Sequence, residues 1–325
     1  MGAVSIGEGG FRDPSSGVTL LVDGDIVAFQ AASVTDGRCY SVEGQNFKYK
    51  ADAVTFTSEH GIPASSISLQ FFPDPVEIAY AVTNQILGDI TNEFTIDKVK
   101  EVKVFLSGSE NFRRKYLPYY KISRKPAAQI LEFFGGDLEL VCRILGTTLP
   151  TFQKRLDDPL DARRPEHLLA VGEYLRTRWS AQEENGLEAD DLIGISMGEC
   201  DRGVIVTTDK DLNTIPGPHY NLSTKARFTV SNEEALLNFY AQCLSGDKTD
   251  TIPGLSGYGE ATAKKALRGC NTAHSLWAEV KKIWAGSHPA GTPAQAIKQA
   301  MDSAACLYIM QERGKEWHPP IQRRR

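Results

Sequence analysis

Long apolar runs are missing from this sequence of 325 residues. Only 41% of the residues are hydrophobic. No run reaches the roughly 18 residues of a membrane-spanning helix, so we expect no role as an integral membrane protein. Residues 1–17 lack a basic start followed by an apolar stretch, which argues against a signal peptide and predicts a short disordered leader. No C-x-x-C motif joins the six cysteines, which argues against a zinc site or a disulfide framework and favours a cytoplasmic location.

Positive charge is also in short supply. The chain has 36 Lys and Arg against 41 Asp and Glu, a net charge of −5, whereas proteins that bind nucleic acid usually show a basic excess. The two signs are nevertheless segregated. Basic residues concentrate at 113–125 and 323–325, and acidic residues at 188–191, 209–211 and 247–250. Such separation suits an acidic cation-binding site beside a basic surface that binds phosphates.

Three short apolar runs end in polar residues and predict buried strands. They are Val18–Val22 before Asp23, Val102–Leu106 before Ser107, and Val204–Val206 before Thr207 to Asp209. Amphipathic helices are expected between them, at 75–89 and 164–182. This alternation predicts an α/β fold with a mostly parallel central sheet and helices on both faces. Because the carboxyl ends of parallel strands line one edge of a sheet, Asp23 and Asp209 should share that edge.

The strongest local signal is the sequence LEADDLIG. Glu188 and Asp191 have the i, i+3 spacing that places both on one helix face, and Asp190 lies between them. A helix N-terminus relieves only about 0.3 to 1 kcal/mol of unfavourable charge per group, so a divalent cation would relieve far more. Taken alone, the motif also fits an ordinary acidic helix N-terminus, which needs no metal.

Two further acidic pairs strengthen the case for a metal site. Asp209 and Asp211 occur in TTDKDL, and Asp247 and Asp250 occur in GDKTDTIPG. Each pair alone is typical of a turn or a helix cap. Together with Asp23 at a strand end, they form a set of hard oxygen ligands without His or Cys, which favours magnesium or manganese over zinc.

Five blocks now stand in order along the chain: LLVDGD, FRRKYLPYYKISRK, EADD, TTDKDL and GDKTDTIPGLSGYGEATA. In this order they resemble the signature motifs of the phage and bacterial 5′→3′ exonucleases of the flap endonuclease superfamily, above all the small stand-alone phage exonucleases. The resemblance implies a PIN-like 5′-nuclease core at 18–245, a helical arch and a C-terminal helix-hairpin-helix-like DNA-binding region at 246–325. It further implies a monomer that hydrolyses DNA, or RNA primers in RNA–DNA hybrids, in the cytosol of a bacterium or phage-infected host.

The resemblance assigns the acidic residues to one site for two Mg²⁺ ions, for which Mn²⁺ can substitute. Its implied ligands are Asp23, Glu188, Asp190, Asp191, Asp209, Asp211, Asp247 and Asp250. Relatives usually have a further acidic residue at the end of the second strand, where this chain has Ser107. Either Ser107 holds a metal-bound water or Glu110 replaces the missing carboxylate. A K⁺ ion in the C-terminal helical corner is also expected.

Basic and aromatic residues alternate in NFRRKYLPYYKISRK. Cations bind phosphates and aromatic faces stack on unpaired bases, although a solvated amphipathic helix with buried tyrosines shows the same pattern. By resemblance, Lys121 and Arg124 match arch residues that contact the scissile phosphate, and Arg113 matches a catalytic residue before the arch. The other residues expected to bind DNA are Arg114, Lys115, Tyr120, Lys125, Gly254, Gly257, Gly259, Lys264 and Lys265.

Relatives usually lack the segment 127–162. Its sequence DLELVCRILGTTLPTFQKRLDDP resembles a helix-turn-helix of the phage repressor type, with Gly146 at the turn and apolar Phe152 on the second helix. We consider a DNA-contacting element, a structural elaboration of the arch, or an artefact of sequence assembly. Elsewhere, a small hairpin is expected within 39–49 and a final helix at 294–313.

Two other functions fit part of this pattern. A PIN-type ribonuclease shares the acidic α/β layout, but it generally has fewer carboxylates and no region like GDKTDTIPG. A catalytically impaired, structure-specific DNA-binding protein would account for Ser107, although the other acidic clusters are intact. Both exonuclease and flap endonuclease activities fit the five blocks.

Overall fold

The computed structural model describes residues 17–158, 160–287 and 291–320. All but the last residue of the expected leader, and the arginines at 323–325, therefore lie outside the described residues. The chain divides into two compact units, which are described separately. The described part of the first unit is 17–23, 97–158, 160–163, 183–287 and 291–320, and the second unit is 24–96 with 164–182.

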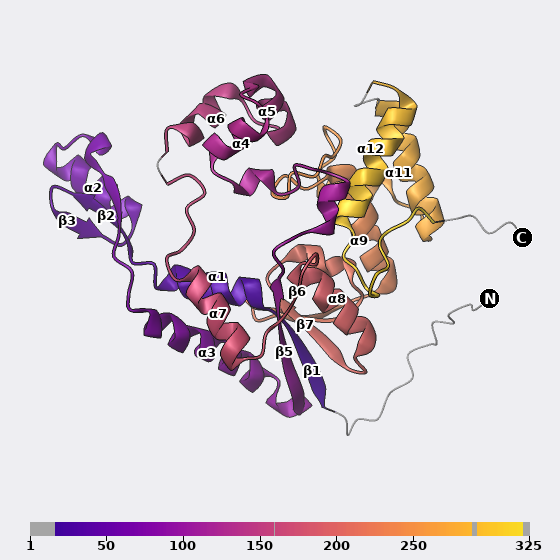
Figure 1. Ribbon diagram of the computed structural model, residues 1–325, viewed down its shortest axis with the longest axis horizontal. Coiled ribbons are helices and arrows are strands. Elements are labelled where there is room, and N and C mark those ends of the chain that lie inside the picture. Colours follow the sequence, from indigo (N-terminus) through magenta and orange to yellow (C-terminus); the bar gives the residue numbers. More distant parts are fainter. Residues whose placement is uncertain (1–16, 159, 288–290, 321–325) are drawn as a thin grey trace, which may run out of the picture. The chain divides into compact units, whose positions relative to one another are not determined.

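A mostly parallel six-stranded sheet forms the centre of the first unit (Figure 1). In spatial order its strands are β6 (Gln182–Glu184), β5 (Val99–Ser107), β1 (Val18–Asp23), β7 (Gly203–Thr207), β8 (Gly217–Asn221) and β9 (Arg227–Val230). Strand β1 pairs in parallel with both β5 and β7, and all six of its residues are buried. Only β9, which pairs with β8, is shown to be antiparallel. This arrangement confirms the predicted α/β class and the three predicted strands.

Helix α8 (Ala189–Glu199) contacts β1, β5 and β7. Its buried face includes Ile193 and Ile195, which pack with Ile205 of the sheet. Gly194 is small because a Cβ there would come within 2.4 Å of the carbonyl oxygen of Met310. The sheet and a later chain segment therefore both fix α8, whose first turn contains the EADD sequence.

The C-terminal part of the first unit is helical. It comprises α9 (Asn232–Ser245), α10 (Glu260–Ala266), α11 (Ala273–Ser287) and α12 (Pro293–Leu307). Their shared core includes Trp277 and Trp284, and the indole N–H of Trp284 donates to the carbonyl oxygen of Cys243 at 2.9 Å. Figure 1 shows α9, α11 and α12 grouped together. The predicted final helix ends at Leu307 instead of Arg313 because the chain becomes extended at Tyr308 and runs against α8.

The predicted insertion forms three helices with a core of their own. They are α4 (Ala127–Phe133), α5 (Leu138–Leu145) and α6 (Leu149–Leu156), and they enclose Ala127, Ile130, Val141 and Phe152. Gly146 ends α5 with a left-handed φ of 59°, and α6 begins three residues later, at Leu149. Segment 127–162 contains six acidic and three basic residues, a net charge of −3, and charge therefore does not favour DNA contact by this insertion.

The second unit combines three helices with a small sheet. Helices α1 (Gly24–Val34), α3 (Val76–Glu93) and α7 (Leu168–Arg178) pack on one another. The sheet has the order β3 (Gln45–Phe47), β2 (Arg38–Val42) and β4 (Ser68–Phe71), and α2 (Lys50–His60) packs on β2 and β3. The expected hairpin is thus confirmed, and so are the two expected helices, although α3 extends to Glu93 and α7 covers only Leu168–Arg178 of the predicted 164–182. In the described parts of both units, no helix is long and apolar enough to cross a membrane.

Candidate metal-dependent active site

Two aspartates lie at neighbouring strand ends, as the sequence predicts. Asp23 ends β1, and Asp209 follows β7, whose Val206 pairs with Val22. The Thr207 hydroxyl donates to Asp23 Oδ2 at 2.9 Å and accepts the backbone N–H of Asp209 at 3.0 Å. One threonine therefore fixes the local geometry of both carboxylates.

The end of β5 contacts the start of α8. The Ser107 hydroxyl oxygen accepts the backbone N–H of Ala189 at 3.1 Å. Glu110, in contrast, is exposed and receives the side-chain amide of Asn185 at 3.4 Å. Of the two residues considered for the missing carboxylate, Ser107 is thus the one in direct contact with the EADD helix.

The carboxylates near Asp23 influence one another strongly. Asp190 is partly buried, and its pKa is raised well above the ordinary value by burial first and then by the negative charges of Asp23, Asp209 and Glu188. Four acidic groups therefore share one neighbourhood. A bound cation would remove their repulsion.

A second acidic group adjoins the first through Asp209. Burial, followed by the charges of Asp209 and Asp247, raises the pKa of Asp211 to about 7. The side-chain amide of Gln242 donates to Asp211 Oδ1 at 2.6 Å, and Asp247 accepts the backbone N–H of Thr249 at 2.7 Å. These contacts orient Asp211 and Asp247 on separate chain segments.

The donor set fits a hard divalent cation. All of the charged donors are carboxylates, and no His or Cys belongs to either acidic group. Within 17–158, 160–287 and 291–320, however, no three of these side chains are arranged as ligands of a single ion.

Basic residues of the predicted arch bind the outer carboxylates. The Lys121 ammonium pairs with Glu188 and lies 3.5 Å from Asp250, and Arg124 also pairs with Asp250. The Tyr120 hydroxyl donates to Glu188 Oε2 at 2.9 Å and to Asp250 Oδ2 at 3.1 Å. Burial opposes ionisation of Glu188, but the charges of Arg113 and Lys121 outweigh it and lower the pKa of Glu188.

Arg113 and Asp191 lie in the interior. Their side chains are 2% and 0% exposed, and the guanidinium binds the carboxylate through two hydrogen bonds of 2.7 and 2.8 Å. Direct contact between Arg113 and a substrate phosphate, as expected from the resemblance, does not fit this burial. Asp191, expected as a metal ligand, has both carboxylate oxygens bound by this guanidinium.

The residues expected to bind DNA fall into three classes. Arg114, Lys115 and Lys125 are exposed, although Lys115 pairs with Glu316. Tyr120 is only 4% exposed and therefore cannot stack on a base as expected. Gly254 packs on the backbone, since a Cβ there would lie 2.1 Å from the carbonyl oxygen of Ser245.

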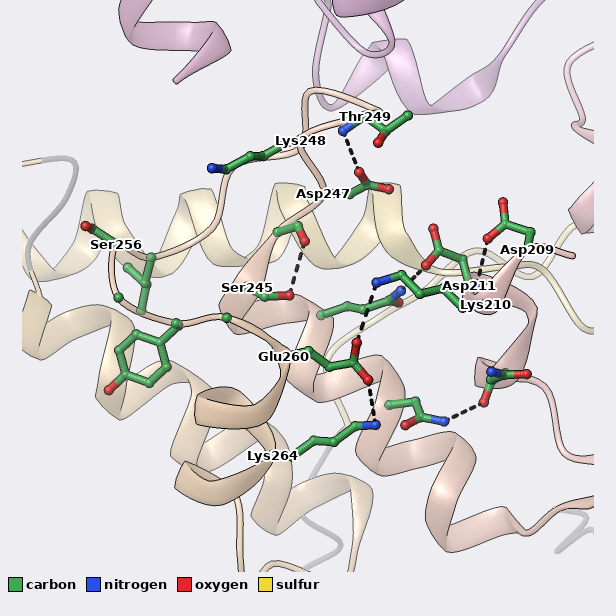
Figure 2. A pocket seen from close by; sticks show the side chains of 18 of the residues that line it. Asp209, Lys210, Asp211, Ser245, Asp247, Lys248, Thr249, Ser256, Glu260 and Lys264 are labelled. Atoms are coloured by element: carbon green, nitrogen blue, oxygen red, sulfur yellow. Dashed lines mark hydrogen bonds and ion pairs between the residues drawn. The ribbon is translucent and has the colours of Figure 1, made fainter. Parts of the chain in front are cut away.

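A hollow of about 720 Å³ joins the second acidic group to α10 (Figure 2). Asp209, Asp211 and Asp247 line one part of it, and another part is lined by Gly257, Tyr258, Gly259, Glu260 and Lys264. Gly259 is the N-cap of α10, and nothing lies within 4 Å of where a Cβ would be at Gly257 or Gly259. Lys264 pairs with Glu260 at 2.9 Å, while Lys265 is exposed. Of the glycines and lysines predicted in this corner, Gly257, Gly259 and Lys264 thus line the same hollow as the carboxylates.

Three site residues were missed from the sequence: Thr207, Gln242 and Asn185. Thr207 had a usable signal, because a hydroxyl at a strand end beside an aspartate commonly caps neighbouring groups. Gln242 and Asn185 had none, since each binds a partner that is distant in the sequence.

Comparison with known proteins places this geometry in context. No family model matches the chain. DNA polymerase I of Bacillus caldotenax is 31% identical over 136 residues, which are 36% of this chain and 16% of that protein. DNA polymerase I of Mycobacterium tuberculosis is 24% identical over 285 residues, 82% of this chain and 24% of that protein. The chain therefore spans a quarter or less of the length of these relatives.

Solved structures from bacteriophage T5 are also similar. The T5 flap endonuclease, in a pseudo-enzyme-product complex with DNA and metal ions, has a TM-score of 0.50 at 13% identity over 88% of this chain and 89% of that one. A zinc-bound T5 5′-exonuclease has a TM-score of 0.49 at 15% identity over 89% of each chain. The T5 flap endonuclease structure supports the predicted α/β fold.

Proposed function

We propose that this chain is a metal-dependent 5′-nuclease that hydrolyses phosphodiesters at or near the 5′ ends of DNA. The observation that supports this proposal most is the acidic group of Asp23, Asp190 and Asp209, in which burial and then the charges of the other two aspartates raise the pKa of Asp190. Next to this group, Lys121 pairs with Glu188 and Arg124 pairs with Asp250. A metal-binding centre next to phosphate-binding cations is the combination that phosphodiester hydrolysis requires.

The metal-binding residues would come from both acidic groups. Asp23, Asp190 and Asp209 would hold one Mg²⁺ or Mn²⁺, and Asp211 and Asp247 a second, with Glu188 and Asp250 completing the set. When bound, two such ions activate a water for in-line attack and neutralise the leaving oxygen. We infer that Ser107 supports this set by holding the start of α8.

The chain's own cations would position the substrate. Lys121 and Arg124 are within reach of the carboxylates, so a phosphate drawn to them would lie beside the metal-binding residues. Exposed Arg114 and Lys125 would extend this contact along the strand. The start of α10 and Lys264, which line the other part of the hollow, would bind the duplex together with the exposed Lys265.

The finer assignments belong to the same proposal. Core residues 18–245, together with Asp247 and Asp250, would perform the chemistry, and the rest of the 246–325 region would hold duplex DNA, with K⁺ bound in its glycine corner. Flaps, gaps and RNA–DNA hybrids are the further substrates we propose for a monomer that acts in bacterial or phage replication and recombination. The relatives' names support a role in DNA metabolism.

Digestion of a 5′-labelled duplex tests the proposal. Wild-type protein with Mg²⁺ should release labelled nucleotides or short oligonucleotides, and both EDTA and Asp209→Asn should abolish release. Asp52→Asn, at an exposed position in the second unit, is the matched control and should cleave normally. Flapped, blunt and hybrid substrates assayed together would show the preferred end structure.

Two results would contradict the proposal. DNA binding without cleavage, with Mg²⁺ and with Mn²⁺, would favour the impaired DNA-binding protein. Cleavage of single-stranded RNA alone would favour the PIN-type ribonuclease.

A further inference from the structure

The buried pair of Arg113 and Asp191 joins three parts of the first unit. Besides Asp191, Arg113 donates from Nε to the carbonyl oxygen of Cys306 at 2.8 Å and from NH2 to that of Tyr308 at 2.9 Å. Its NH1 also lies 3.5 Å from Glu188 Oε2. The guanidinium of Arg113 thereby links the segment before the arch to the start of α8 and to the end of α12, where Cys306 and Tyr308 lie.

The oxygens of Asp191 are fully engaged by protein donors. Oδ1 accepts from Arg113 NH2 at 2.8 Å and from the backbone N–H of Met310 at 3.0 Å. Oδ2 accepts from Arg113 NH1 at 2.7 Å and from the backbone N–H of Glu188 at 3.1 Å. A carboxylate offers about four lone-pair positions, so no position remains for a metal ion unless one of these bonds breaks.

Close packing fixes the segment after α12, which supplies the Tyr308 carbonyl oxygen to Arg113 and the Met310 N–H to Asp191. A Cβ at Gly194 would meet the carbonyl oxygen of Met310 at 2.4 Å, and one at Gly198 would meet that of Gln311 at 3.0 Å. The segment therefore lies directly on the α8 backbone. Displacing it would pull Met310 away from Asp191.

We propose that Arg113 and Asp191 are positioning residues that hold Glu188 and Asp190 in place, and that Asp191 is not a metal ligand. This inference rests on the proposed nuclease function. Asp190, the neighbour in sequence, is only partly buried, whereas the Asp191 side chain is fully buried and paired with Arg113. The two adjacent aspartates therefore have different tasks: Asp190 faces the metal-binding group, and Asp191 faces the interior.

Double variants distinguish a positioning residue from a ligand. Removal of one partner leaves a buried charge uncompensated, whereas removal of both charges leaves a neutral hydrogen-bonding pair. Mn²⁺ binding is followed by electron paramagnetic resonance, together with the urea midpoint and the kcat and KM of cleavage. Asp191→Asn and Arg113→Gln should each lower the urea midpoint and weaken Mn²⁺ binding by about tenfold without loss of a site. The double variant should recover most of the loss in the urea midpoint and most of the loss in Mn²⁺ affinity.

The matched control exchanges the neighbouring aspartate. Asp190→Asn should remove a Mn²⁺ site without lowering the urea midpoint, and Arg113→Gln should not rescue it. Gly194→Ala, which changes neither charged group, should reproduce the Arg113→Gln effects by displacing Met310. In all positioning variants kcat should fall while KM stays near the wild-type value, because the phosphate-binding cations are intact.

Loss of a Mn²⁺ site in Asp191→Asn, without recovery in the double variant, would overturn the positioning role. Additive effects of the two single changes on the urea midpoint would overturn it as well. Failure of the nuclease proposal would show differently, as absence of both Mn²⁺ binding and cleavage in the wild-type protein.

Discussion

The backbone N–H of Lys121 donates to the carbonyl oxygen of Asp250 at 2.8 Å, and the ammonium of the same lysine lies 3.5 Å from the Asp250 carboxylate. The lysine thus contacts the loop that supplies Asp247 and Asp250 through both its main chain and its side chain. Lys121 has a left-handed φ of 58°, which this double attachment helps to maintain. Lys121, which is expected to bind substrate phosphate, is therefore attached directly to one of the acidic residues of the site.

Lys121→Met should separate metal binding from catalysis. The substitution leaves Glu188 and Asp250 without their lysine partner, so Mn²⁺ should bind more tightly. Cleavage should nevertheless fall about 100-fold, because a phosphate-binding cation is lost. Lys125→Met, at an exposed position, is the control and should change both quantities little. Weaker Mn²⁺ binding by Lys121→Met would contradict the expectation.

Ser107 offers a test of the missing carboxylate. Ser107→Ala removes the acceptor for the Ala189 N–H and should cost about 0.5 to 2 kcal/mol in the free energy of unfolding. Ser107→Asp should keep that acceptor and add a carboxylate at the end of β5, which should raise Mn²⁺ affinity. Urea unfolding and Mn²⁺ titration measure the two effects. Unchanged or weaker Mn²⁺ binding by Ser107→Asp would mean that this strand end does not face the metal-binding group.

Arg155 is one of the side chains that attach the insertion to the arch residues before it. Arg155 pairs with Asp161 at 2.8 Å and donates to the carbonyl oxygens of Ser123 and Lys125 at 3.2 and 2.9 Å. Arg155→Ala and Asp161→Ala should therefore be non-additive, with a coupling of about 1 kcal/mol for this partly exposed pair. Urea unfolding of both single variants and the double variant measures the coupling. Additivity would show that the backbone contacts alone hold the insertion.

The strand ends and acidic clusters could be predicted from sequence because their signals are local. An apolar run followed by an aspartate defines where Asp23 and Asp209 lie, and parallel pairing then brings them together. The first turn of α8 is similar, since EADD begins a helix wherever it occurs before an apolar run.

Local signals could not predict which side chains of the arch segment are buried and which are exposed to solvent. Arg113 and Arg114 are adjacent and chemically identical, yet only Arg113 is buried, because Asp191 lies 78 positions further along the chain. Tyr120 likewise turns inward toward Glu188 and Asp250. Alternation of basic and aromatic residues does not specify such distant partners. The end of α12 at Leu307 likewise depends on packing between segments that are distant in the sequence.

Acid should destabilise the protein partly through His219. This side chain is 2% exposed, its Nε2 lies 2.9 Å from the carbonyl oxygen of Ile215, and its Nδ1 has no hydrogen-bond partner among the described residues. Burial lowers its pKa below the ordinary value, which the hydrogen bond to Ile215 only partly offsets. The unfolded chain therefore takes up a proton at a higher pH than the folded protein does. Stability should be full above about pH 6.5 and should fall as the pH drops toward the folded-state pKa.

His219→Gln removes this titrating group. The urea midpoint of the variant should depend less on pH between pH 7 and 5 than that of the wild-type protein, even if its stability at pH 7 is lower because stacking on Phe228 is lost. His274→Gln, at an exposed position, should keep the wild-type slope. An unchanged slope in His219→Gln would assign the acid sensitivity to other groups. A steeper slope would mean that His219 is protonated in the folded protein, which its burial beside Phe228 argues against.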